Sequence, residues 1–294
     1  MSTENTTIGF IGLGVMGEPI CRNMAIRSGR KVVAFDLRRE PLERLAASGV
    51  TAAADIADLV NRADTIVLSL PGGDQLQKVV QGAGGILEYV RAGMTVVDTT
   101  TAPVDLTREL AREFAARGVA FADAPIARTR AAAEEGTLSI MVGGDAEVFE
   151  RIRPLLSAAA TDITHCGPVG CGQVVKLLNN MVLFETVVAL AEALSIGEGA
   201  GVDPTLLLET LSKGSADSFA LRNHGMKAML PGVFPENAFP TEYAMKDLAY
   251  ALRLADDVGV EARSARLTGE LLQATRDKGF GKVYFPAVLN VVRP

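Results

Sequence analysis

The sequence IGFIGLGVMG at residues 8–17 decides the fold, because an apolar run ends there in a G-x-G-x-x-G pattern. Residues 16–28 follow with the composition of a helix. In such a strand–turn–helix unit, Gly12 permits a tight turn, Gly14 lets a pyrophosphate approach the backbone, and Gly17 allows close packing. The helix start adds unpaired N–H groups and the positive end of its dipole. The stretch predicts a dinucleotide site; the alternative is a glycine-rich turn without a ligand. The cofactor contacts expected in this turn are Gly12, Leu13, Gly14, Val15, Met16 and Gly17.

Outward from this turn, the first half of the chain alternates strand patterns with helix patterns. Further strands are expected at residues 31–35, 65–70, 95–98, 119–123 and 138–142. Helices are expected among them at residues 40–48, 75–81 and 103–117. Strands separated by helices indicate right-handed βαβ crossovers and a mostly parallel, doubly wound sheet of Rossmann type.

The pattern changes after residue 172, where strand patterns stop. Residues 172–199 read as one long interdomain helix, about 40 Å in length at 1.5 Å per residue. The remaining helices are expected at residues 204–212, 241–258 and 261–278. We therefore expect an α/β Rossmann-type, NAD-binding domain at residues 1–168 and an all-α domain at residues 169–294.

The choice of cofactor rests on the end of the second expected strand. Asp36 lies there, about twenty residues after the glycine turn. A carboxylate at this point accepts hydrogen bonds from the ribose hydroxyls of NAD and repels a 2′-phosphate. Arg38 and Arg39 follow, and a nearby arginine can hold that phosphate. We therefore predict NAD, with NADP as the second choice.

Two later loops follow strands and should face the same ligand, because ligands bind outside the carboxyl ends of parallel strands. The first begins Leu70-Pro71-Gly72, and the second contains three consecutive threonines that end at Thr101. We expect cofactor contacts at Leu70, Pro71 and Thr101. The alternative is that these small and hydroxylated residues only form turns.

The start of the long helix carries an unusual polar group. Lys176, Asn179 and Asn180 interrupt an otherwise apolar run. Residues three and four apart are neighbours on a helix, so the three side chains share one side. Burying them without a purpose is costly, which points to a site with a reactive lysine. A solvated helix face is the alternative.

A third loop offers positive charge to a substrate. Arg128, Thr129 and Arg130 follow an expected strand that ends at Asp123. The planar guanidinium donates in a fork that fits a carboxylate, phosphate or sulfonate. The alternative is a surface loop with two solvated arginines.

Composition excludes several classes. A formal net charge of −6 over 294 residues lacks the basic footprint of a nucleic-acid binder. Three cysteines form no disulfide framework, which favours a reducing compartment. We expect no metal; the alternative is a zinc site at His165, Cys166 and Cys171. With no targeting signal and no uninterrupted apolar run of about 18 residues, we expect a cytoplasmic protein and no membrane span.

Five segments taken in order resemble the β-hydroxyacid dehydrogenase family, which includes 3-hydroxyisobutyrate and tartronate-semialdehyde reducing enzymes. The resemblance spans essentially the whole chain. The segments are GFIGLGVMGEPICRNM (residues 9–24), DTTTAPV (98–104), DAPIARTRAAAEEGTLSIMVGG (123–144), GPVGCGQVVKLLNN (167–180) and the Met245-Lys246-Asp247-Leu248 motif.

The resemblance implies a role for each matching position. Lys176 would be the catalytic lysine, and Asn180, with Asn179, would bind the substrate. Thr101 would contact the nicotinamide ribose. Lys246 would reach the cofactor and substrate from the helical domain. Members of the family form dimers or tetramers through the long helix, which implies a homodimer or homotetramer.

One departure from the family pattern concerns the substrate. Most members have Ser-Gly-Gly where this chain has Ala127-Arg128-Thr129. The Arg-Thr pair is similar to that of the sulfolactaldehyde reductase branch, in which these residues recognise a sulfonate. Arg128 and Thr129 are therefore expected to bind an anionic head group, either a sulfonate or the carboxylate of a semialdehyde.

The expected reaction is reversible hydride transfer between NAD(H) and a small anionic aldehyde or hydroxyacid, with Lys176 as general acid and base. A carboxylate-specific reductase of the 3-hydroxyisobutyrate or tartronate-semialdehyde type is the alternative within the family. Imine reductases have the same architecture but usually lack the lysine. A non-catalytic dinucleotide-binding protein is the remaining alternative.

Overall fold

The computed structural model describes residues 6–236 and 238–293. The polar N-terminal segment, residues 1–5, lies outside the described residues. The chain forms two compact units, Met1–Lys176 and Leu177–Pro294. The sequence pattern places the boundary eight residues earlier, before the long helix. The difference arises because the first turns of that helix are bonded to the strands of the first unit, as shown below.

Six parallel strands form the Rossmann part of the first unit, in the order β3-β2-β1-β4-β5-β6. β1 therefore lies between β2 and β4, and this is where the strand order reverses and where such sheets bind ligands. The strands are β1 (Ile8–Ile11), β2 (Val32–Phe35), β3 (Thr51–Ala52), β4 (Thr65–Leu68), β5 (Thr95–Asp98) and β6 (Ala120–Asp123).

Three further strands extend this sheet to nine. β8 (Leu138–Gly143) pairs antiparallel with β6 and with β7 (Ile126–Ala127), and parallel with β9 (Ala160–Gly167). The sequence pattern did not reveal β3, β7 or β9. β3 and β7 have only two residues each, and β9 is mostly exposed or half-buried, so it lacks an apolar alternation.

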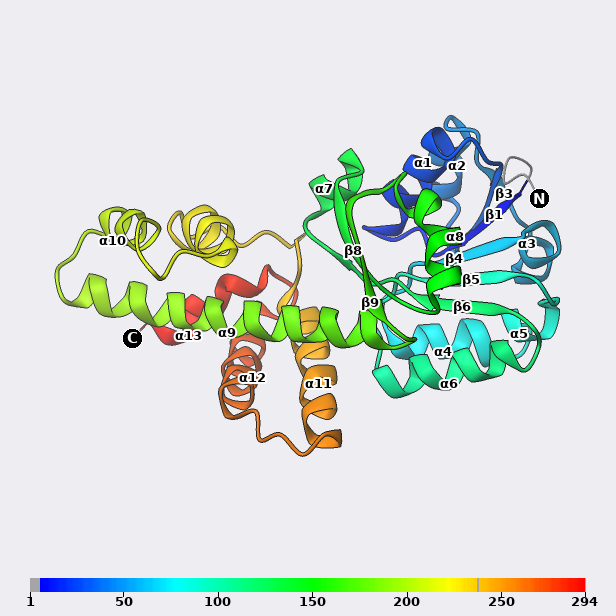
Figure 1. Cartoon of the computed structure of the whole chain (residues 1–294). Helices are drawn as coiled ribbons and strands as arrows, with labels where there is room; N and C mark the ends of the chain where they lie inside the picture. The colour runs from blue at the N-terminus through cyan, green and yellow to red at the C-terminus, as the bar shows by residue number, and fades with distance from the viewer. Residues whose placement is uncertain (1–5, 237, 294) are drawn as a thin grey trace. The chain divides into compact units, whose positions relative to one another are not determined.

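Helices cover both faces of the sheet (Figure 1). Buried side chains of one face pack against α1 (Gly17–Arg27), α2 (Glu40–Ala46), α7 (Arg130–Glu135) and α8 (Ala146–Leu156). Those of the other face pack against α3 (Ile56–Arg62), α4 (Gly73–Gln81), α5 (Ile86–Tyr89) and α6 (Val104–Ala115). The architecture is the predicted doubly wound α/β sheet.

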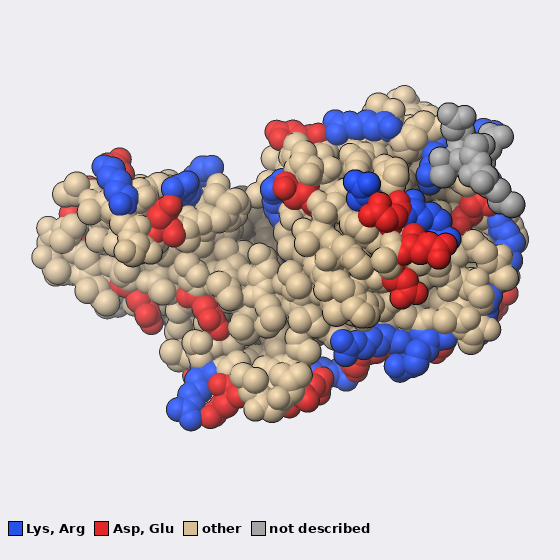
Figure 2. Space-filling model, in the orientation of Figure 1, with Lys and Arg blue, Asp and Glu red and all other residues tan. Residues whose placement is uncertain are grey.

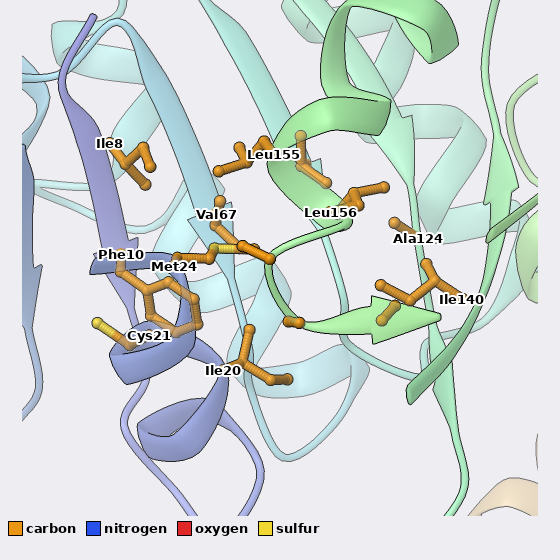
Figure 3. Close-up of a cluster of buried hydrophobic side chains, with 14 of the residues drawn as sticks. Ile8, Phe10, Ile20, Cys21, Met24, Val67, Ala124, Ile140, Leu155 and Leu156 are labelled. Carbon is orange, nitrogen blue, oxygen red and sulfur yellow. The ribbon is translucent and has the colours of Figure 1, made fainter. Parts of the chain in front are cut away.

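The first of these two cores lies beneath the glycine turn. Figure 3 shows Phe10 of β1 beside Met24 of α1, with Leu156 of α8 in the same cluster. All three side chains are fully buried. Burial of a large apolar side chain contributes about 1.5–3 kcal/mol, so this cluster holds α1 firmly against the strand that precedes the turn.

The second unit is helical, as predicted. It is built on α9 (Cys171–Gly199), the long helix, which begins in the first unit. Its core joins Phe184 of α9 to Leu248, Leu272 and Phe285. The other helices are α10 (Pro204–Leu211), the π-helix η2 (Leu221–Met229), α11 (Thr241–Asp257), α12 (Arg263–Thr275), η3 (Arg276–Phe280), η4 (Phe285–Val288) and α13 (Leu289–Val292).

By length and composition alone, α9 could cross a membrane. An 18-residue window has a mean hydropathy of 1.6, and 44% of that window is buried within the chain. This is weak support for a span, because the core helix of a soluble protein meets the same test. The sequence argument predicted this helix but expected no membrane span, because it counted only uninterrupted apolar runs.

Charged side chains are mixed on the face of the molecule shown in Figure 2. Lys and Arg side chains lie near Asp and Glu side chains there and do not gather into one basic patch.

Candidate active site

The glycine turn has the space that a pyrophosphate needs. Gly12 has a φ of +96°, and a Cβ there would lie 2.3 Å from the carbonyl oxygen of Ser69. A Cβ on Gly17 would lie 2.0 Å from the carbonyl oxygen of Gly12. At Gly14, by contrast, an added Cβ would meet no atom within 4 Å. The outer glycines are therefore required by the fold, whereas the space beside Gly14 is open, as the predicted approach of a pyrophosphate requires.

Asp36 is bonded directly to this turn. Its Oδ2 accepts a hydrogen bond of 2.6 Å from the Leu13 N–H, and its Oδ1 accepts one of 2.9 Å from the Arg38 N–H. Burial raises the pKa of Asp36, but these hydrogen bonds outweigh burial and hold the pKa below its ordinary value. The Arg38 guanidinium also bonds Asp36 and donates 2.9 Å to the Leu13 carbonyl. Arg38 thus stabilises an ionised Asp36, which suits the ribose hydroxyls of NAD.

The loops after β4 and β5 are bonded to each other. The Leu70 N–H donates 3.0 Å to Oγ1 of Thr100, and Oγ1 of Thr99 donates 2.7 Å to the Leu68 carbonyl. Thr101 is half-buried, and no hydrogen bond of its side chain occurs within the described ranges. Its hydroxyl is therefore able to bond a ligand, and its contact with the nicotinamide ribose stays a prediction.

Two carboxyl groups lie buried beneath these loops, at paired positions of β5 and β6. Complete burial is the main reason that the pKa of Asp98 is raised to about 7, and the neighbouring Asp123 adds to the rise. Burial also raises the pKa of Asp123 to about 6, although the N–H groups of Gly170 and Gln173 favour its carboxylate. Asp123 accepts these bonds at 2.7 and 2.8 Å, and so caps the start of α9.

We predict that Asp98→Asn is more favourable for stability, relative to wild type, at pH 8 than at pH 5. Native Asp98 holds its proton up to about pH 7, whereas the unfolded carboxyl loses it near pH 4, so wild-type stability falls as pH rises through this window. The difference in unfolding free energy between variant and wild type should be about 2–3 kcal/mol larger at pH 8 than at pH 5. Urea unfolding measures it. The exposed Asp145→Asn is the control, and a pH-independent difference for Asp98→Asn would contradict the prediction.

Two of the three polar residues predicted on the long helix are buried. Lys176 is 9% exposed and Asn180 is 4% exposed, and they lie one helical turn apart on α9. The solvated-face alternative does not hold for these two residues. Asn179 is exposed, and its Nδ2 donates 3.1 Å to Oδ1 of Asn180.

A buried carboxylate that sequence reasoning did not single out fixes the orientation of Asn180. Asp247 on α11 is 2% exposed, and its Oδ2 accepts 2.8 Å from Nδ2 of Asn180. Its Oδ1 lies 3.0 Å from Nζ of Lys246, the residue predicted to reach the cofactor. The same Nζ lies 5.5 and 5.3 Å from the ring centroids of Tyr243 and Tyr250. The signal for Asp247 was its place beside Lys246 in the Met245-Lys246-Asp247-Leu248 motif.

The arginine predicted to clamp the substrate is bonded within the chain. The guanidinium of Arg128 donates 2.6 Å to the carboxylate of Asp162, 3.0 Å to the hydroxyl of Thr161 and 2.6 Å to the carbonyl of Thr137. The hydroxyl of Thr129 accepts 3.4 Å from the Ala132 N–H and caps α7. The structure thus brings Arg128 to the start of β9, a position that the sequence did not suggest.

The backbone at Arg128 keeps a conformation typical of glycine. Its φ is +85°, and among the described residues it alone is a non-glycine residue with positive φ. Such a conformation costs an L-residue about 1–2 kcal/mol. The loop therefore has a backbone that glycine adopts without strain, with a cationic side chain added.

The alternative zinc site is not supported by the surroundings of His165. Its Nε2 lies 2.7 Å from the Gly144 carbonyl, and its ring stacks on Phe149 with centroids 4.8 Å apart. Among residues 6–236 and 238–293 there is no cluster of three or more His, Cys, Asp or Glu side chains suited to a metal ion.

Comparison with known families matches both parts of the chain. Residues 7–167 match the family model described as the NAD binding domain of 6-phosphogluconate dehydrogenase. Residues 170–292 match the model described as NAD-binding of NADP-dependent 3-hydroxyisobutyrate dehydrogenase.

Similar proteins cover nearly the full length. The chain is 34% identical to 2-(hydroxymethyl)glutarate dehydrogenase of Eubacterium barkeri, over 98% of this chain and 95% of that protein. It is 32% identical to an NAD-dependent L-serine dehydrogenase of Pseudomonas aeruginosa, over 98% of each. A solved structure of Mycobacterium tuberculosis 3-hydroxyisobutyrate dehydrogenase with L-serine has a TM-score of 0.89 at 29% identity, covering 98% of this chain and 99% of that one. Because both parts of the chain match and these relatives extend along both, the chain belongs to the β-hydroxyacid dehydrogenase family and is an NAD-dependent oxidoreductase acting on CH–OH groups.

Proposed function

We propose that the enzyme interconverts a small anionic hydroxyacid and its aldehyde, with Lys176 as general acid and base and NAD as hydride carrier. The observation that carries this proposal is the buried face of α9. A lysine and an asparagine are withdrawn from water there, and the asparagine is fixed by a buried carboxylate. Lysine side chains usually stay in contact with water, so the burial of this one indicates a use beyond a place on the surface.

The protein's part in the reaction is proton transfer and orientation. NAD, when bound at the glycine turn, supplies or accepts the hydride. In the reducing direction the Lys176 ammonium donates a proton to the developing alkoxide, and in the oxidising direction the neutral amine removes the hydroxyl proton. Asn180, held by Asp247, orients the same oxygen. General acid–base assistance of this kind contributes about 10²–10⁴-fold to the rate.

We propose that residues 127–129 bind the anionic head group of the substrate. Arginine occupies a position where its backbone is strained, which points to a use for its side chain. In the structure that side chain is paired with Asp162, so a substrate anion must compete with this carboxylate. A sulfonate offers three acceptor oxygens to such a loop, and a carboxylate offers two.

Paired aldehydes of similar size test this assignment. We would measure kcat/KM for NADH oxidation with 3-sulfolactaldehyde and with succinic semialdehyde, using methylmalonate and tartronate semialdehydes as controls. A tenfold preference for the sulfonate, about 1.4 kcal/mol, would make Arg128 its specificity determinant. A preference for a carboxylate would assign the loop to carboxylate binding. If none of the aldehydes in the set were reduced by NADH, that result would contradict the proposed function.

We predict that Arg128→Gly lowers kcat/KM for the preferred anionic aldehyde about tenfold, the value of one charge-assisted hydrogen bond. It should leave a neutral aldehyde of the same size unaffected. Glycine adopts a φ of +85° without strain, so the backbone of the variant can keep the loop conformation. Arg130→Gly is the control, because Arg130 pairs with Glu134 in the same segment. Equal losses for charged and neutral aldehydes would refute the clamp.

We also propose a homodimer or homotetramer in the cytoplasm. Leu178, Val182 and Ile196 form an exposed apolar stripe on α9, with 41%, 56% and 71% of each exposed, and a second copy would cover it. Sedimentation of the purified protein as a monomer would contradict this.

The proposed cytoplasmic location rests on three free cysteines, Cys21, Cys166 and Cys171, which suit a reducing compartment. Cell fractionation tests this location.

A further inference from the structure

The buried side chain of Gln173 bonds the backbone on both sides of Thr101, the residue expected to contact the nicotinamide ribose. Gln173 is 0% exposed, and its Nε2 donates 2.7 Å to the carbonyl of Thr100. Its Oε1 accepts 3.2 Å from the N–H of Ala102. One amide therefore satisfies the peptide groups on both sides of Thr101. Both donor and acceptor are needed, because one of the loop groups is a carbonyl and the other an N–H.

The same glutamine belongs to the first turn of α9, which is fixed in the first unit. Its own N–H donates to Asp123, as does the N–H of Gly170. A Cβ on Gly172 would lie 2.4 Å from the Met141 carbonyl, so the turn packs directly on β8. Lys176 follows Gln173 by three residues and is its neighbour on the helix.

We propose that Gln173 is a positioning residue that sets the loop carrying Thr101 in register with the helix carrying Lys176. This inference rests on the proposed function, because it concerns the hydride transfer assigned to that site. The loop orients the nicotinamide end of the cofactor, and the helix presents the proton donor. Hydride and proton must reach one carbonyl group, so both parts must be fixed relative to each other. Misplacement by about 1 Å can lower a rate about 100-fold.

The test separates positioning from cofactor affinity. In Gln173→Ala, the single-turnover rate of hydride transfer from NADH to the aldehyde that wild type reduces best should fall roughly 10–30-fold. The Kd of NADH should change less than about threefold, since the glycine turn and Asp36 are unaltered. Stopped-flow absorbance gives the rate, and fluorescence titration gives the Kd.

The conservative variant Gln173→Glu gives a pH-dependent rate that a purely structural role of Gln173 would not produce. In Gln173→Glu, the protonated carboxyl has an O–H for the Thr100 carbonyl and an acceptor for the Ala102 N–H, whereas the carboxylate only accepts. Its hydride-transfer rate, divided by the wild-type rate at each pH, should therefore rise as pH falls from 8.5 to 6. Asp98 and Asp123 titrate near the same loop in both proteins, and a carboxyl group at position 173 is coupled to them, so the ratio reports the protonation of these three groups together.

Leu190→Ala is the control for general destabilisation. Leu190 is buried on the same helix, about 26 Å from Gln173 along its axis, and the truncation costs about 2–5 kcal/mol without touching the loop. It should leave the hydride-transfer rate unchanged. An unaltered rate in Gln173→Ala, or a pH-independent ratio for Gln173→Glu, would overturn the proposal. Failure of wild type itself to transfer hydride would instead count against the proposed function.

Discussion

Replacing Lys176 with alanine should lower kcat about 1000-fold in the reduction of the preferred aldehyde, the middle of the range for general acid–base catalysis. The ammonium group is the proposed proton donor to the alkoxide, and water would replace it poorly in a site where the lysine is 9% exposed. The Kd of NADH should stay within about twofold, because the glycine turn and Asp36 form the cofactor site assigned here. Steady-state kinetics and fluorescence titration measure the two quantities.

Two comparisons separate the proton from the charge. Lys176→Arg keeps a cation but cannot release its proton near neutral pH, so it should be about as inactive as the alanine variant. Lys227→Ala should behave like wild type, because Lys227 is an exposed lysine bonded to Asn223 on η2. Near-normal turnover in Lys176→Ala would refute the assignment. So would full activity in Lys176→Arg, since positive charge alone would then suffice.

Most of the Rossmann fold could be predicted because its strands are buried on both faces. Thr95–Asp98 was predicted with its observed bounds, and it is buried along its whole length. Two of the elements that escaped prediction lack such a pattern, whereas the helices Ile56–Arg62 and Ala146–Leu156, which were also not predicted, do bury apolar side chains. Thr51–Ala52 is an exposed strand of two residues, and the helix at Arg130–Glu135 lies in an alanine- and charge-rich segment. Local sequence gives little signal for elements that tertiary contacts define.

The residues of the candidate site could be named from the sequence, but the hydrogen bonds between them could not. The glycine turn, Asp36 and Lys176 follow from spacing and from apolar context. The partners of these residues come from distant parts of the chain. Asp247 is 67 residues from Asn180, and Gln173 bonds a loop more than 70 residues away. A hydrogen bond between such residues depends on tertiary placement that no local pattern encodes.

Arg128 shows the same limit most clearly. Its charge and its loop suggested an anion clamp, but sequence could not reveal the carboxylate of Asp162, 34 residues away, to which the guanidinium is bonded. The sequence also could not show that the backbone of Arg128 has a positive φ, which is unfavourable for a residue with a side chain. The substrate assignment therefore depends on a competition between two anions, which only kinetics with charged and neutral aldehydes resolves.

Replacing Gly14 with valine should abolish most cofactor affinity without disturbing the fold. A side chain at this position meets no protein atom within 4 Å of its Cβ, so the free enzyme has room for it. The same space is where a pyrophosphate would approach the backbone. The Kd of NADH should rise at least about 100-fold, equivalent to about 2.7 kcal/mol. Calorimetric titration measures the affinity, and the unfolding temperature without cofactor should match wild type.

Gly17→Ala provides the contrast that makes this result specific. Its Cβ would lie 2.0 Å from the Gly12 carbonyl oxygen, so this variant should unfold at lower temperature even without NADH. If both variants lost affinity and stability together, the open space at Gly14 would be needed by the fold itself. Loss of affinity alone in Gly14→Val is the result that distinguishes a ligand-binding glycine from a structural one. Unchanged NADH binding in that variant would instead place the pyrophosphate elsewhere and remove the basis for assigning the turn to NAD.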